Sequence, residues 1–134
     1  MKISNGPNRK KGNKIMKNFE LFMGCLGNGI TVCNKAIEEN GDYKTIAHIA
    51  ENGNIKFYTE PGKIPGKDLL KIEHAANVRY EKFKKWLSSL PESNRYQFLL
   101  DKVQHNDFMF ALRMNGSIAD KIAYLETKFY QMHY

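Results

Sequence analysis

The first half of the chain alternates short apolar, β-branched runs with turns that contain asparagine and glycine. Residues 19–26 and 30–36 flank Gly27-Asn28-Gly29, and residues 43–50 and 54–59 flank Asn52-Gly53. Asn-Gly between such runs indicates a tight hairpin turn, because both residues tolerate a positive φ. The pattern therefore predicts two hairpins in succession, which form a four-stranded antiparallel meander.

The second hairpin has a sequence that predicts its register. If Asn52 and Gly53 are the two central residues of the turn, Ala50 pairs with Ile55, and His48 pairs with Phe57. One face then carries Ile46, His48, Ala50, Ile55 and Phe57, and the other carries Ala47, Ile49, Lys56 and Tyr58. Both faces mix apolar and polar residues, which predicts a sheet that is covered on one side and partly hydrated on the other.

The second half of the chain has helical periodicity. Pro61-Gly62 and Pro65-Gly66 end the strand pattern. Between Lys67 and Leu90, apolar residues recur at intervals of three and four positions, at Leu69, Ile72, Ala76, Tyr80, Phe83, Leu87 and Leu90. Pro91 ends this long helix, and residues 92–104 and 107–114 predict two shorter helices. Ser117 with Asp120 three positions later is a capping signature for a last helix through Phe129.

Strands followed by helices predict an α+β fold. We expect an N-terminal antiparallel four-stranded β-meander, made of two hairpins and packed by the long helix, followed by a C-terminal helical segment. A chain of 134 residues suits one domain with a single core of moderate size. We place this domain at residues 18–134.

The net charge of +7 is concentrated at the N-terminus. Residues 1–17 contain six of the 21 Lys and Arg residues and no acidic residue. Residues 18–134 hold the other 15 against all 14 Asp and Glu residues, which leaves a net charge of +1. Because residues 1–17 are also poor in apolar side chains and contain Gly6, Pro7 and Gly12, we predict a disordered basic tail there.

This tail has two competing interpretations. A flexible cationic arm would neutralise the phosphates of nucleic acid without reading their sequence. Alternatively, residues 1–15 are upstream sequence and the native start is Met16. Lys10-Lys11-Gly12 is encoded by AAR-AAR-GGN, a purine-rich string that resembles a bacterial ribosome-binding site and lies three codons before Met16.

The residue types needed for catalysis or metal binding are few and scattered. The four histidines fall in different predicted elements, at His48, His74, His105 and His133. No HxH, HExxH or CxxC motif occurs, and Cys25 and Cys33 are too few for a disulfide framework. We therefore expect a protein that is not an enzyme and that holds no metal and no cofactor.

His48 is the histidine of most interest, because it lies between apolar neighbours in a predicted strand. A half-buried structural histidine is the favoured interpretation. Cys33, His48 and Asp42 have the residue types of a thiol nucleophile, a base and an orienting acid, although the sequence does not bring them into one pocket.

The apolar runs of the chain are too short to cross a bilayer, and no apolar stretch follows the N-terminal charges as it does in a secretory signal. These two observations predict a cytoplasmic protein that does not associate with a membrane.

Two sets of surface residues are candidates for binding. The nucleic-acid-binding set interleaves cations with an aromatic ring and contains Arg9, Lys10, Lys11, Lys14, Lys82, Lys84, Lys85 and Trp86. The protein-interaction set contains Tyr43, Tyr58 and Trp86. An open sheet edge can accept an added strand from another chain, so we include the sheet edges with the second set as a candidate protein-binding surface. The partner is then either an unidentified protein or, alternatively, nonspecific DNA or RNA bound by the basic tail and the Lys82–Lys85 helix face.

The stretch FELFMGCLGNGITVCNKAIEENGDYKTIAHIAENGNIKFY, residues 19–58, resembles a group of small uncharacterised proteins carried by mobile elements and phage-related regions of Firmicutes. The resemblance begins near residue 16 and extends to SSLP at residues 88–91. It implies no catalytic residues. It does imply a bacterial accessory protein of a mobile element, a setting in which small proteins bind host factors, nucleic acid or defence complexes, and we favour the protein-interaction module.

Overall fold

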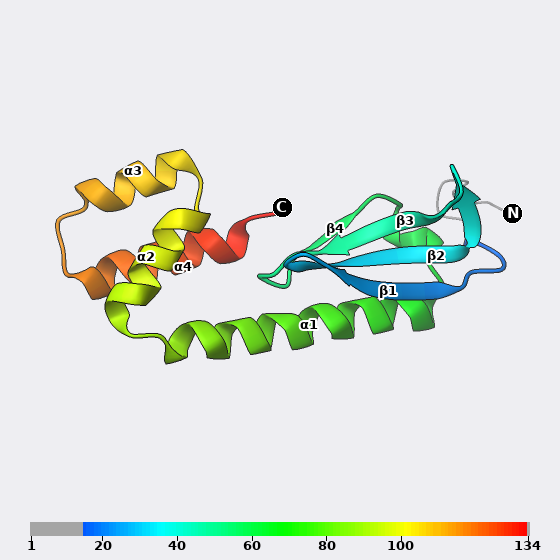
Figure 1. Cartoon of the computed structure of the whole chain (residues 1–134), viewed down its shortest axis with the longest axis horizontal. Coiled ribbons are helices and arrows are strands. Elements are labelled where there is room, and N and C mark those ends of the chain that lie inside the picture. Colours follow the sequence, from blue (N-terminus) through cyan, green and yellow to red (C-terminus); the bar gives the residue numbers. More distant parts are fainter. Residues whose placement is uncertain (1–14, 134) are drawn as a thin grey trace, which may run out of the picture.

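The computed structural model describes residues 15–133 and has the α+β fold that the sequence predicts (Figure 1). The strands are β1 (Leu21–Leu26), β2 (Gly29–Glu39), β3 (Asp42–Ile49) and β4 (Ile55–Phe57). A single turn of 3-10 helix, η3 (Pro61–Lys63), leads into the helices α1 (Gly66–Ser89), α2 (Glu92–Lys102), α3 (His105–Arg113) and α4 (Ile118–Gln131). The predicted strands and helices are thus confirmed in order and in type.

The four strands form one antiparallel sheet in the order β1-β2-β3-β4. The hairpin of β1 and β2 closes with Leu26 opposite Gly29, so Gly27 and Asn28 are the central residues of its turn. Gly27 has a φ of +60°, which glycine adopts without strain. The predicted hairpin is confirmed, but its turn is centred one residue before the Asn-Gly pair.

The predicted register of the second hairpin is wrong by one residue. Ile49 pairs with Ile55, Ala47 with Phe57, and His48 with Lys56. The connection is a loop of residues 50–54, in which the Ala50 N–H donates to the Asn54 carbonyl at 2.9 Å. Because a shift by one residue exchanges the two faces of a strand, Ala47 and Ile49 share a face with Ile55 and Phe57, whereas His48 and Lys56 lie on the opposite face.

This loop is longer than the predicted two-residue turn because both residues of the Asn52-Gly53 pair contact other elements. The Asn52 amide donates to the carbonyls of Phe129 and Met132, at 2.9 and 3.0 Å. Gly53, with a φ of +88°, lies against α1 so closely that an added Cβ would be 2.6 Å from Cβ of Tyr80. Asn52 and Gly53 therefore make tertiary contacts that cannot be predicted from the local sequence pattern.

Helix α1 covers one face of the sheet (Figure 1). Buried residues of β2, β3 and α1 form the cluster beneath it, together with Ile64, and comprise Val32, Ile46, Ala47, Ile49, Ile64, Ile72 and Ala76. The helix begins directly after Pro65, and Asp68 supplies an acidic residue in its first turn. Because the apolar residues recur every three or four positions, they lie on one side of α1, and this side packs against the sheet.

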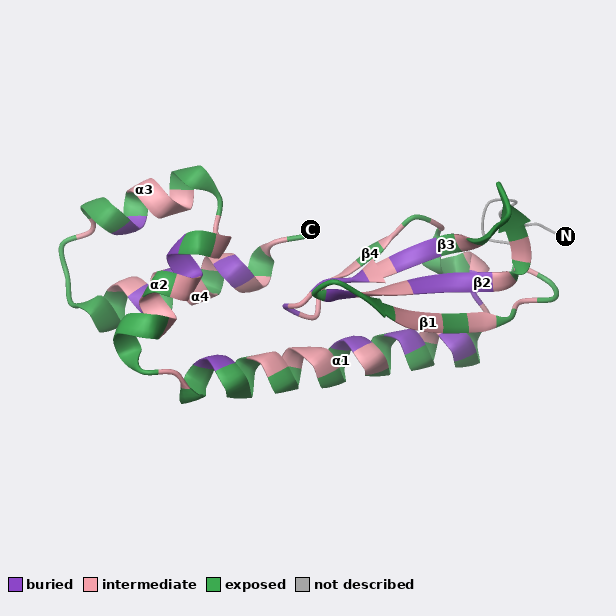
Figure 2. Ribbon diagram, viewed as in Figure 1, coloured by how far each residue is buried: buried purple, intermediate pink, exposed green. Residues whose placement is uncertain are grey.

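A second buried cluster lies where α1 extends past the sheet (Figure 2). It joins the end of α1 to α2, α3 and α4 and comprises Leu87, Leu99, Leu100, Ala111, Ile122, Leu125 and Phe129. Ser117 and Asp120 form the predicted capping box at the start of α4. The single core expected from chain length is therefore divided in two, because the apolar stripe of α1 is longer than the sheet that covers its first half.

The loop of residues 50–54 joins the two clusters. Besides the two bonds of Asn52, the Asn54 amide donates to the carbonyls of Tyr130 and Met132. The last carbonyls of a helix have no partner within the helix, so these amides satisfy groups that α4 cannot. The Glu51 carboxylate lies 3.0 Å from Nζ of Lys102 on α2. This loop thus fastens the sheet to the C-terminal helices, in addition to α1, which runs through both clusters.

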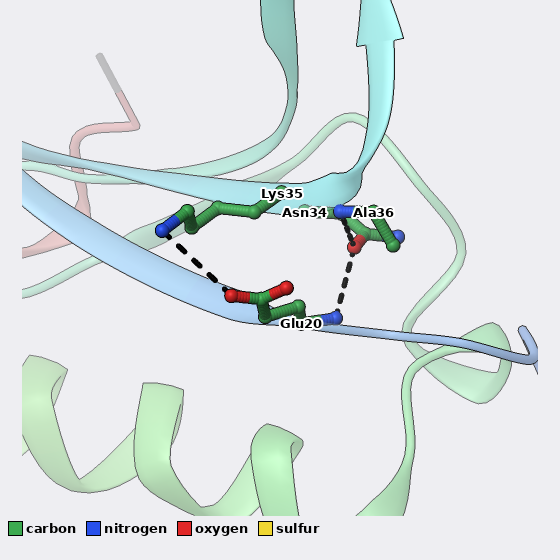
Figure 3. A network of polar contacts seen from close by, with 4 residues as sticks. All are labelled: Glu20, Asn34, Lys35 and Ala36. Atoms are coloured by element: carbon green, nitrogen blue, oxygen red, sulfur yellow. Dashed lines mark hydrogen bonds and ion pairs between the residues drawn. The ribbon is translucent and has the colours of Figure 1, made fainter.

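The segment before β1 is held by Asn34 of β2 (Figure 3). The Asn34 side-chain oxygen accepts from the backbone N–H groups of Glu20 and Ala36, both at 3.0 Å, and Nζ of Lys35 lies 3.7 Å from the Glu20 carboxylate. The Met16 N–H donates to the Lys63 carbonyl at 2.8 Å. Most of the predicted tail, residues 1–14, lies outside the described residues, and Met16 already contacts the fold.

Candidate functional site

A groove of about 620 Å³ lies between the β1–β2 turn and α1. Its apolar lining comes from Ile30, Ala75, Val78, Phe83 and Trp86. Its charged and polar lining includes Cys25, Asn28, Glu51, His74, Arg79 and Lys82. The volume falls within the roughly 300–1,000 Å³ typical of ligand pockets, and an apolar floor with a few polar groups is the usual composition of a binding site.

Arg79 connects the two walls of the groove. Its Nη2 donates to the backbone carbonyl of Asn28 in the β1–β2 turn. Its Nε is buried and, within residues 15–133, has no hydrogen-bond partner. The guanidinium therefore fixes the turn against α1 and keeps a cation at the groove.

Aromatic rings close the groove near the helical cluster. Trp86 packs against Phe83 and Phe98, with ring centroids 5.4 and 5.2 Å apart, and Phe83 stacks on Phe129 at 5.3 Å. Trp86 nevertheless remains 46% exposed. The core thus fixes the position of the Trp86 ring, and part of the ring remains exposed to solvent. A tryptophan held in this way is suited to anchor a binding partner.

The charges of the groove have one predominant sign. Its two cationic side chains, Arg79 and Lys82, lie on α1. Glu51 is the acidic residue of the lining, and it pairs with Lys102, with 11% of its side chain exposed. The groove consequently combines cationic and apolar side chains, most of them from α1.

The strand β1 borders the groove, and within residues 15–133 no strand pairs with its other edge, called here the free edge. It stands at one end of the strand order and pairs with β2. The Lys35 N–H donates to the Glu20 carbonyl, and Glu20 is opposite Lys35, so even-numbered residues of this strand direct their backbone groups toward β2. The backbone groups of Leu21, Met23 and Cys25 then point outward, and Cys25 also lines the groove.

The sequence-predicted residues of α1 divide between two surfaces. Lys82 and Trp86 line the groove, whereas Lys84 and Lys85 line a separate hollow of about 430 Å³ with Glu81 and Ser88. Nζ of Lys84 lies 5.6 Å from the centre of the Tyr80 ring. Lys82 and Lys84, two positions apart, project to nearly opposite sides of α1, so the Lys82–Lys85 stretch is divided between two surfaces.

Tyr43 and Tyr58 are exposed on the sheet, away from the groove lining. The ring of Tyr43 meets that of Phe22 edge-on at 6.2 Å, and Nζ of Lys35 lies 5.5 Å from the centre of the Tyr43 ring. Nζ of Lys56 lies 5.7 Å from the centre of the Tyr58 ring. The structure does not bring either tyrosine together with Trp86. The tail residues Arg9, Lys10, Lys11 and Lys14 lie outside the described residues.

The trio of Cys33, His48 and Asp42 is not assembled into a site. Asp42 begins β3 opposite Glu39, and His48 lies six residues farther along the same strand. At about 3.3 Å per residue, these two residues are separated by roughly 20 Å. Cys33 is buried opposite Thr45, with the sulfur 3.9 Å from the threonine hydroxyl. Among residues 15–133, no group of three or more His, Cys, Asp or Glu side chains is arranged to hold a metal ion.

Sequence reasoning missed most of the groove, although one signal was present. His74, Val78, Lys82 and Trp86 recur every four residues and form a stripe beside the core stripe of α1. This stripe places two apolar residues, one of them a tryptophan, among polar ones. An exposed surface that mixes apolar and cationic side chains is typical of a binding site. Cys25, Asn28 and Glu51 carry no comparable signal, because the fold alone brings their turns to α1.

No protein-family model matches the chain, and neither a curated protein nor a solved structure matches it. Within the described part of the chain, no helix combines the length and the apolar character that crossing a membrane requires.

Proposed function

We propose that this chain is a small non-enzymatic protein-interaction module that binds a partner by adding a strand to the free edge of β1. The observation that carries the proposal is the edge itself, whose sequence LFMGCL contains no charged residue and no proline. Exposed edge strands are usually protected by lysine, proline or a bulge, since they otherwise pair with other chains. An unprotected edge beside a groove is what strand addition uses, with main-chain bonds giving affinity and the groove giving specificity.

The resemblance to proteins of mobile elements supports an accessory role in a bacterial cytoplasm. On this proposal, the partner is a protein of the host or of the element. The exposed aromatic residues Tyr43 and Tyr58 would extend the contact over the sheet, and Trp86 would contribute from the groove.

The proposal is tested by removing one outward N–H from the edge. Cys25→Pro deletes the outward donor and leaves the β1–β2 ladder intact, because proline is tolerated on the free side of an edge strand. Cys25→Ser is the matched control, since it changes the same side chain and keeps the N–H. The full chain and both variants serve as baits for affinity purification from the native host.

We expect a partner protein that is captured by the wild type and by Cys25→Ser and is lost with Cys25→Pro. Far-ultraviolet circular dichroism must show that the proline variant is folded. If it is not, a bulky maleimide is attached to the exposed Cys25 thiol of the wild type, where it fills the groove beside the edge and obstructs an added strand, while the buried Cys33 is spared. Equal capture by all forms, the blocked one included, would show that the β1 edge is not the interface.

Nonspecific nucleic-acid binding stays the alternative. It depends on the basic tail, of which residues 1–14 lie outside the described residues, and on Lys82, Lys84 and Lys85, which face two different hollows.

A further inference from the structure

We propose that the segment captured by β1 is an acidic peptide that inserts an apolar side chain into the groove. This inference rests on the proposed function and specifies the chemistry of its partner. It follows from three features that meet at Cys25: the direction of the β1 backbone, the apolar floor of the groove and the sign of its charges.

The backbone of β1 sets the register of an added strand. Its outward groups belong to Leu21, Met23 and Cys25, whose side chains lie on the face covered by α1. Side chains of paired strands that lie opposite each other point to the same face. A residue paired with Cys25 therefore directs its side chain toward α1 and into the groove that Cys25 lines.

The floor of the groove favours an apolar anchor. Val78 is 42% exposed and Trp86 is 46% exposed, and together with Ile30 and Phe83 they surround the space of about 620 Å³. Filling this space with an aliphatic or aromatic side chain removes apolar surface from water on both partners.

The charges of the groove favour an acidic segment. Arg79 and Lys82 stand on the α1 wall, and the carboxylate of Glu51 is paired with Lys102. Carboxylates on either side of the anchor would meet these cations, which fixes the orientation of the peptide and accelerates its association. A second copy of this chain fits less well, since β1–β1 pairing would bring two basic walls together.

The probe is a phage-displayed library of random linear peptides, selected on the full chain. Selected peptides are synthesised without tryptophan, so that Trp86, the single tryptophan of the chain, reports their binding through its fluorescence. We expect the selected sequences to be enriched in Asp and Glu around an aliphatic or aromatic residue.

Two pairs of variants test the two kinds of contact. Lys82→Glu should weaken binding of a selected peptide about tenfold, whereas Lys84→Glu, with the same change in net charge on nearly the opposite side of α1, should change it less than about twofold. Val78→Asp should abolish binding, whereas Leu112→Asp, an exposed apolar residue of α3, should leave it unchanged.

Several results would overturn the inference. Selected peptides without acidic enrichment, or equal effects of Lys82→Glu and Lys84→Glu, would refute the acidic partner. Tight binding of decanoate that Cys25→Pro does not affect would assign the groove to a small amphiphile. A concentration-dependent dimer in sedimentation that Cys25→Pro abolishes would assign the edge to a second copy.

The failure of this inference is distinguishable from that of the proposed function. If selected peptides are neutral or basic yet depend on the Cys25 N–H, strand addition stands and the acidic partner fails. If neither the peptides nor the captured protein responds to Cys25→Pro, the proposed function itself fails.

Discussion

Replacing Asn52 with alanine should lower the free energy of unfolding by about 2 kcal/mol. The Asn52 side chain, 1% exposed, donates to the carbonyls of Phe129 and Met132, and its oxygen accepts from the Asn54 N–H at 3.0 Å. Each of these three bonds contributes roughly 1 kcal/mol net. The loss is partly offset, because the Phe129 carbonyl also accepts from the Met132 N–H and the Met132 carbonyl also accepts from Asn54.

A loss of this size is a large part of the roughly 5–15 kcal/mol that stabilises a typical domain. It corresponds to a fall in Tm of roughly 8 °C for a chain of this length. Urea denaturation followed by far-ultraviolet circular dichroism and by Trp86 fluorescence measures the change. We expect a lower midpoint with an unchanged m value, since the native contacts weaken while the surface exposed on unfolding stays the same.

Asn77→Ala is the matched control, because Asn77 is exposed on α1. Alanine has the higher helix propensity, so this variant should be neutral or more stable by about 0.5 kcal/mol. A destabilisation by Asn52→Ala below about 0.5 kcal/mol would refute the reasoning that the loop of residues 50–54 fastens the sheet to α4.

Three further predictions follow from particular residues. Burial, with a smaller contribution from the charge of Glu126, raises the pKa of Tyr130 from 10.0 to about 12. The folded state therefore keeps a proton that the unfolded state releases, and stability present below pH 10 is lost as the pH rises toward 12. Tyr130→Phe should reduce this alkaline fall in urea midpoint, and an unchanged fall would contradict it. Gly53→Ala should destabilise more than Gly41→Ala, because both glycines have a positive φ but an added Cβ contacts neighbouring atoms only at Gly53; equal urea midpoints would be the contrary result. If the nucleic-acid alternative holds, fluorescence anisotropy with single-stranded DNA should show affinity that falls steeply with salt and falls further in Lys85→Glu; salt-independent binding would argue against it.

The element types were predictable because they depend on local patterns. The three- and four-residue spacing of apolar side chains between Leu69 and Leu90 is a property of neighbouring turns, and it located α1 almost to the residue. The capping pair Ser117 and Asp120 located the start of α4 in the same way. Alternation and turn residues were equally sufficient for the strands and their order along the chain.

The register of the second hairpin and the position of the groove were decided only by the tertiary structure. Asn52 is separated from its partner Phe129 by 77 positions. The conformation of the loop around Asn52 satisfies this distant contact, whereas the Asn-Gly pair by itself favours a two-residue hairpin turn. The groove likewise joins Asn28, Glu51 and Lys82 from three distant segments. A local pattern fixes how a segment folds, because its interactions lie within a few residues. Which face is covered and which residues meet depends on packing between segments, and no period in the sequence encodes that.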